Sequence, residues 1–168
     1  CLLPIARAPF QGSALTITIS GLQGGPAATE IHKGRANANM LMGRLLQAVA
    51  AATEMRIVAV NGGLKDNAIP IKTQAQVLVA DAAAAKAAAQ EMGAHFAAEY
   101  RVTDPNVAVS VEDAGEGEAM DAASTKKVLC MLTCLPNGVQ VMSADIAGLV
   151  QTSLNLGILT TGDETVDA

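Results

Sequence analysis

Apolar and hydroxyl-bearing residues alternate along residues 15–20, whose sequence is LTITIS. A period of two puts Leu15, Ile17 and Ile19 on one face of an extended chain, so the stretch predicts a half-buried β-strand with these side chains inward. A second strand, RIVAVNGG at residues 56–63, is predicted to end in an Asn-Gly turn. Apolar stretches predict a third strand at 72–80 and a fourth at 107–111.

Two segments between these strands have the composition and the caps of helices. The first predicted helix begins at about Asn37 or Asn39, because either asparagine is a good N-cap. Asp81 is expected to cap a second, alanine-rich helix that runs to about Tyr100. The order is therefore β-α-β-β-α-β, which predicts an α+β fold: a ferredoxin-like antiparallel sheet with helices on one face.

The last third of the chain has a different pattern. Residues 1–112 hold the ferredoxin-like unit, and the acidic, small-residue-rich segment 113–123 predicts a flexible connector. Within 124–168 we predict a helix at 124–135, a turn at PNG, and strands at about 139–142 and 152–160. These elements open a second unit of the same kind without completing it, so we expect the sequence to be a fragment.

Composition narrows the class of protein. The 168 residues suit one domain or two small ones, and a net charge of −5 without a basic face argues against nucleic-acid binding. The longest apolar run, about 82–89, is interrupted by Lys86 and is far shorter than the roughly 20 residues of a membrane span. No secretory signal pattern begins the chain. We therefore expect a cytoplasmic protein with no membrane partner.

Three cysteines are present, and two of them, Cys130 and Cys134, lie four residues apart in CMLTC. On a helix they would share a face, but the further ligands of a thiolate metal site are missing. We interpret them as buried thiols in a reducing compartment.

Candidate chemistry gathers in GGPAATEIHKGRANAN, residues 24–39. His32 lies between a glycine pair and a predicted helix start, together with Lys33 and Arg35. Cations near a helix N-terminus are unfavourable by about 0.3–1 kcal/mol each, so helix stability does not explain them. These residues could instead form a cluster of hydrogen-bond donors for an anionic oxygen of a ligand. The alternative is that they belong to an exposed polar loop with no such role.

Asn67, in NAIP, is a second candidate, whose amide could reach a ligand or only organise a turn. Catalytic metal chemistry has little support: a dinuclear zinc hydrolase needs about five or six His, Asp and Glu ligands. The two histidines lack the spacing of a metal site, and no GxSxG elbow or phosphate loop is present. We predict no metal site and no cofactor in this chain, and no catalysis by the chain alone.

Four segments together resemble the inserted lid domain of Xaa-His (aminoacyl-histidine) dipeptidases, carnosinase-like zinc metallopeptidases. The segments are TITISGLQGG, EIHKGRANANMLMGRLL, NGGLKDNAIP and LPNGVQVMSADIAGLVQTSLNLGILTT. They follow the order found in the family, and together they span most of residues 14–162. The most specific parts are IHKGRANAN and QTSLNLGILTT. One departure is Pro26-Ala27, where the family usually has His-Ser after the glycine pair.

The resemblance implies a division of labour. It implies that a catalytic domain, encoded on either side of the lid, holds two zinc ions, while the lid closes over a dipeptide substrate and forms a homodimer interface. By this resemblance, His32 matches the position of a histidine that donates to the oxyanion, and Asn67 matches an asparagine associated with substrate binding. Arg35 is also expected to bind the substrate. Two other hypotheses remain at this point: a stand-alone ferredoxin-like binding or assembly module, and a self-sufficient hydrolase.

Overall fold

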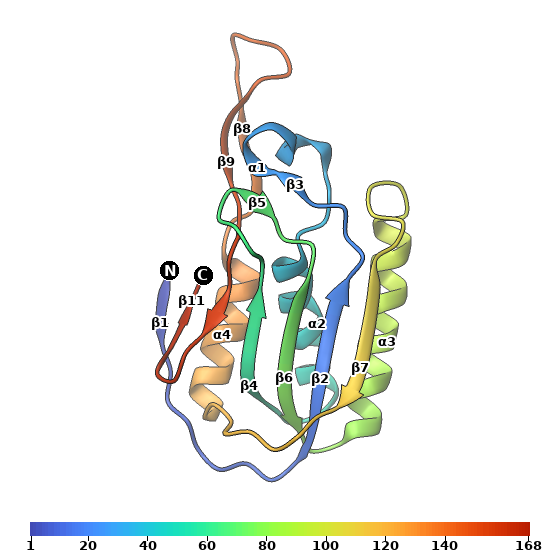
Figure 1. Ribbon diagram of the computed structural model, residues 1–168, viewed down its shortest axis with the longest axis vertical. Coiled ribbons are helices and arrows are strands. Elements are labelled where there is room, and N and C mark those ends of the chain that lie inside the picture. The colour runs from blue at the N-terminus through green and yellow to red at the C-terminus, as the bar shows by residue number, and fades with distance from the viewer.

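The central feature of the fold is a four-stranded antiparallel sheet with the order β4-β6-β2-β7 (Figure 1). The computed structural model describes residues 1–168. The chain visits these strands in the order β2-α2-β4-β6-α3-β7, which confirms the predicted ferredoxin-like topology. The strands are β2 (Ser13–Ser20), β4 (Met55–Gly62), β6 (Thr73–Val79) and β7 (Ala108–Asp113).

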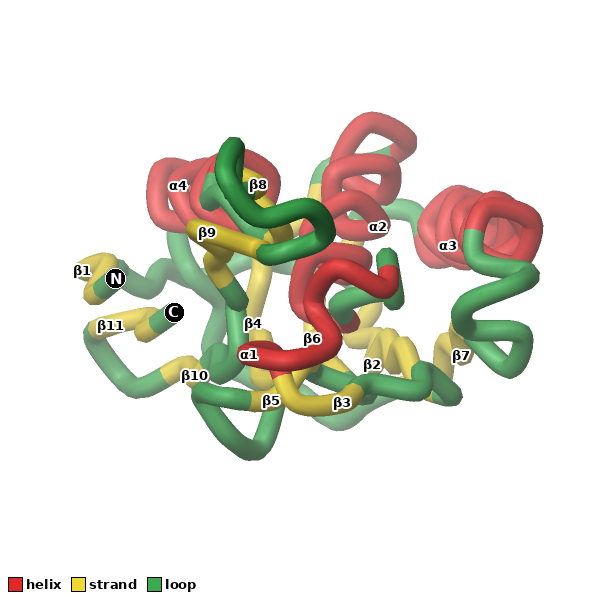
Figure 2. The backbone as a smooth tube through the Cα atoms, turned by 90° about the horizontal axis from the view of Figure 1, so that it is seen from above, coloured by secondary structure: helices red, strands yellow, loops and turns green.

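Three helices lie in a row on one face of this sheet, as seen from above in Figure 2. Each begins at a side chain that accepts hydrogen bonds from the first turn, which satisfies backbone N–H groups that have no partner within the helix. The caps are Asn37, one of the two predicted candidates, Asp81, as predicted, and Asp121. The helices are α2 (Ala38–Ala52), α3 (Ala82–Glu99) and α4 (Ala122–Cys134).

The main core fills the space between the sheet and the helices. Leu15, Ile17 and Ile19 are at most 1 % exposed, which confirms the inward face predicted from the alternation in β2. Helices α2 and α4 approach closely at Gly43, where an added Cβ would lie 2.7 Å from the Cβ of Leu132. A glycine is therefore required for this contact at the present helix spacing.

The predicted connector 113–123 contains no helix or strand between the end of β7 and the start of α4. Its last part is packed: Ala119 and Met120 are buried, and Met120 donates its N–H to the carbonyl of Ile57. Val58, Leu78 and Ala119 form a small cluster separate from the main core. The mobility of the connector stays a prediction.

After α4 the chain forms a hairpin that projects beyond the sheet, β8 (Gly138–Met142) and β9 (Val150–Leu154) (Figure 1). The single strand predicted at 152–160 is wrong, because β9 and β10 (Thr160–Thr161) are separate strands. Between them the chain leaves the extended form and buries Leu156 and Leu159. A three-stranded sheet then joins both ends of the chain, β1 (Leu2–Pro4), β11 (Thr165–Asp167) and β10.

The interpretation of the cysteines as buried thiols is wrong, because Cys1, Cys130 and Cys134 are all exposed. Helix α4 turns Val128 and Leu132 into the core, and the two cysteines of CMLTC lie on its solvent side. In all the helices of the fold, none combines the length and apolar content that crossing a bilayer requires.

Candidate functional site

A polar pocket of about 340 Å³ lies beyond the N-terminus of α2, where four parts of the chain meet. Its walls come from the segment before α2, from Ile69, from Tyr100 at the end of α3, and from the base of the β8–β9 hairpin, where β8 begins and β9 ends. The lining residues are Ile31, His32, Gly34, Arg35, Asn37, Ile69, Tyr100, Asn137, Gly138, Val139 and Asn155. Several of them belong to the motifs IHKGRANAN, LPNG and SLNLG that the sequence singled out.

His32 lies on a short 3₁₀ helix, η1 (Ile31–Lys33), and not in an irregular loop. This turn follows β3 (Gly25–Pro26) and a single turn of helix, α1 (Ala27–Glu30). Gly34 ends it in the left-handed region at φ 67°, which favours glycine. The imidazole of His32 is exposed and makes no hydrogen bond within the chain, so it is free to meet a ligand.

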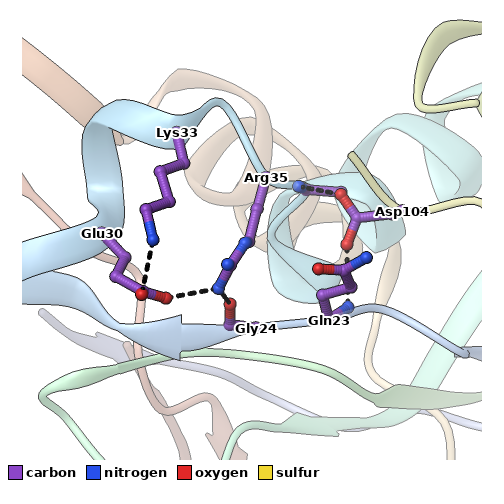
Figure 3. Close-up of polar contacts among 7 residues, drawn as sticks. Gln23, Gly24, Glu30, Lys33, Arg35 and Asp104 are labelled. Carbon is purple, nitrogen blue, oxygen red and sulfur yellow. Dashed lines mark hydrogen bonds and ion pairs between the residues drawn. The ribbon is translucent and has the colours of Figure 1, made fainter. Parts of the chain in front are cut away.

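Lys33 and Arg35 both form ion pairs with Glu30, an acidic residue that the sequence interpretation overlooked (Figure 3). The Nζ atom of Lys33 lies 2.6 Å from one Glu30 oxygen, and Nη1 of Arg35 lies 2.5 Å from the other. Arg35 Nη1 also donates to the carbonyl of Gly24. The hydrogen bond from Lys33, with help from Arg35, lowers the pKa of Glu30 below its ordinary value. Two cations and one anion leave the cluster with a net positive charge.

A buried carboxyl group fixes both ends of the segment that carries His32 (Figure 3). Asp104 is fully buried; its Oδ1 accepts from the N–H of Gln23 and its Oδ2 accepts from the N–H of Ala36, each at 2.8 Å. Residues 23 and 36 bracket β3, α1 and η1. One side chain after α3 therefore holds the start and the end of the His32 segment together.

Asparagine amides form the opposite wall of the pocket. Nδ2 of Asn37 lies 3.1 Å from Oδ1 of Asn137, whose Oδ1 also accepts from the N–H of Leu156 at 3.0 Å. Asn155 donates to the carbonyl of Ala68 at 2.8 Å. The sequence identified Asn37 only as a cap and missed the other two, because each looks locally like an ordinary turn residue. This network ties the β8–β9 hairpin to α2 and to the loop before β6.

Asn67 is not brought into the pocket with His32 and Arg35. It lies exposed just before β5 (Ala68–Ile69), and its carbonyl accepts from the N–H of Ala27 at 2.9 Å. A larger pocket of about 560 Å³ is lined by Gly25 and by residues 61–65 and 68–74, and Asn67 does not line it. We regard the smaller pocket as the candidate site, because His32 and Arg35 line it together with asparagines from remote segments.

The pocket is rich in hydrogen-bond donors and suits an oxygen-bearing ligand. His32, the remaining N–H groups of Arg35 and the asparagine amides lie around it, and burial raises the pKa of Tyr100, so that its hydroxyl keeps its proton. No group of three or more His, Cys, Asp or Glu side chains is placed to hold a metal ion. The site can bind and polarise, but its residues do not form a metal centre.

The chain is similar to a known family of protein domains and to two dipeptidases. Residues 17–104 match the family model described as a peptidase dimerisation domain. The cytosol non-specific dipeptidase of Escherichia coli (strain K12) is 34 % identical over 155 residues, which cover 90 % of this chain and 32 % of that protein. The crystal structure of aminoacylhistidine dipeptidase from Vibrio alginolyticus matches 98 % of this chain and 35 % of that chain, with a TM-score of 0.90 and 30 % identity. The chain thus spans about a third of the length of these similar proteins.

Proposed function

Because the chain belongs to the peptidase dimerisation domain family, we propose that it is the lid and dimerisation domain of a zinc-dependent Xaa-His dipeptidase. In this proposal the domain pairs with a second copy, closes over the dipeptide, and works in the cytoplasm as part of a longer protein. Two similar proteins with dipeptidase names, each about three times as long, support it. The ends of the described chain also leave the domain side by side, because β1 and β11 are paired.

The zinc ions belong to parts of the enzyme outside this chain. The side chains that line the pocket do not fit a catalytic zinc centre, which takes three protein ligands, since no three potential ligands come together. The role left to this domain is to bind, orient and shield the substrate from water.

The observation that carries the proposal is the position of His32. Its imidazole is exposed beside the pocket, has no partner within the chain, and lies next to a cluster with net positive charge. We infer that His32 donates a hydrogen bond to the substrate oxygen that becomes negative when the peptide bond is attacked. Removing one such preorganised donor typically raises the barrier by about 2.7–4 kcal/mol.

Arg35 and Asn67 take supporting roles in the same proposal. Arg35 keeps N–H groups beyond the Nη1 contacts to Glu30 and Gly24, and these would orient a substrate carboxylate. Asn67 lies outside the pocket, so it would reach substrate from a separate direction as the lid closes. Loss of Arg35 would also release Gly24 and Glu30, so its substitution tests folding and binding together.

The test is steady-state kinetics of the full-length parent enzyme with the substitution His32→Ala. We expect kcat to fall by about 10²–10³-fold with a much smaller change in KM. His95→Ala is the matched control, because His95 is the other histidine and lies exposed on α3 near Glu91. An unchanged kcat in the His32 variant, or a loss confined to KM, would remove His32 from the chemistry.

Assembly is tested separately on this chain by analytical ultracentrifugation. A dimer is expected, and a species that stays monomeric at high concentration contradicts the dimerisation role. We also expect the chain alone to leave Xaa-His dipeptides uncleaved. Turnover by the pure chain that a chelator abolishes would favour the self-sufficient hydrolase instead.

A further inference from the structure

The solvent side of α4 carries two thiols at close range. The Sγ atoms of Cys130 and Cys134 lie 3.8 Å apart, and both residues are exposed. Neither residue lines the pocket that contains His32. The pair therefore lies outside the candidate site.

We propose that Cys130 and Cys134 form a chelating site for one soft, thiolate-seeking metal ion. Two sulfur atoms bound at about 2.3 Å to a tetrahedral ion are about 3.8 Å apart, which is the separation seen here. Thiolate ligands select soft ions over hard ones such as Mg²⁺ or Ca²⁺. The helix thus presents both sulfurs at the spacing that such an ion requires.

A disulfide is the competing use of two neighbouring cysteines, and the helix disfavours it. Side chains four residues apart on a helix have Cβ atoms about 5–6 Å apart, whereas a disulfide needs about 3.5–4.5 Å. Cys134 is the last residue of α4, and the N–H of Leu135 still bonds to the carbonyl of Met131. Oxidation would have to unwind this turn, so the pair stays available as a dithiol while α4 is intact.

Cysteine binds a metal ion as the thiolate, so each thiol of the pair gives up its proton when it binds. Binding of a divalent ion forms two metal–sulfur bonds and releases two protons to solvent, with no change in oxidation state. No third His, Cys, Asp or Glu joins the pair, so water or other small ligands complete the coordination.

The experiment is a titration of the reduced chain with Cd²⁺, followed by the thiolate-to-cadmium charge-transfer absorbance. We expect saturation at one ion per chain and no competition from Mg²⁺. Because the second thiolate binds within the same molecule, Cys130→Ser or Cys134→Ser should weaken binding by about 10²-fold or more. All variants carry Cys1→Ser as well, so that the exposed thiol and the free amine at residue 1 do not chelate the ion themselves.

Three results would overturn the proposal: no saturable band, a band that survives Cys134→Ser at full affinity, or saturation at one ion per two chains. The last would mean that sulfurs of different molecules hold the ion. Because both cysteines are exposed, the serine variants should keep the helical circular dichroism of the parent, so a lost band reports on the ligands and not on unfolding.

Discussion

Replacing Asp104 should destabilise the domain far more than replacing an ordinary surface carboxylate. Asp104→Ala leaves the buried N–H of Ala36 and the partly buried N–H of Gln23 without acceptors. A buried donor left unsatisfied costs about 1–3 kcal/mol, so the two together give a loss of about 3 kcal/mol. For a chain of this size that corresponds to a fall in Tm of roughly 6–12 °C. Asp104→Asn keeps one acceptor and should lose about half as much.

The measurement is urea unfolding followed by circular dichroism, with amide hydrogen exchange at Ala36 as a local readout. Asp113→Ala is the control, because the Asp113 side chain is 85 % exposed and pairs with Lys86 at the surface. Such a pair contributes at most about 1 kcal/mol. The reasoning is refuted if Asp104→Ala is as stable as Asp113→Ala, or if the Ala36 N–H stays as protected as in the parent.

Three further outcomes are expected from the structure. Gly43→Ala should lower the urea midpoint, because a clash with Leu132 costs about 1–3 kcal/mol and outweighs a gain in helix propensity of about 1 kcal/mol; a raised midpoint would contradict this. Asn37→Ala removes the α2 cap and buried hydrogen bonds, so a loss of about 2 kcal/mol is expected in the same assay, and unaltered stability would contradict it. The contribution of the lowered Glu30 pKa is present above the ordinary value of 4.5 and is lost as the pH falls through the lower folded value. Urea midpoints of the parent should therefore fall more steeply on acidification than those of Glu30→Gln, and parallel curves would refute it.

The fold was predictable where short-range patterns decide it. Alternation in β2 identified the buried face correctly, since Leu15 and its partners two residues apart all point into the core. Caps are local too: Asp81 accepts from the N–H of Ala84, three residues along the chain. Such signals operate within one turn or a few residues of strand, so the sequence contains them in full.

The errors arise where tertiary contacts override a local pattern. Residues 152–160 have strand-like composition, yet the chain bends inward to bury Leu156 and Leu159. Cys130 and Cys134 share a helix face as predicted, but which face meets the core depends on where α2 lies against α4. That docking is decided by residues such as Gly43, about 90 positions away.

The candidate site shows the same limit more sharply. His32 and Arg35 could be proposed from one motif, but the wall they face is made by Asn137 and Asn155, and the hydrogen bond from Asn37 to Asn137 joins residues 100 positions apart. Nothing local distinguishes those asparagines from turn residues. Asp104 lies outside the motif and accepts hydrogen bonds from Gln23 and Ala36 at the two ends of the His32 segment. No local pattern in the sequence indicates this role. The position of His32 is therefore a property of the folded domain and not of its motif. A short peptide with the sequence IHKGRANAN would keep the histidine but lose the contacts that aim it.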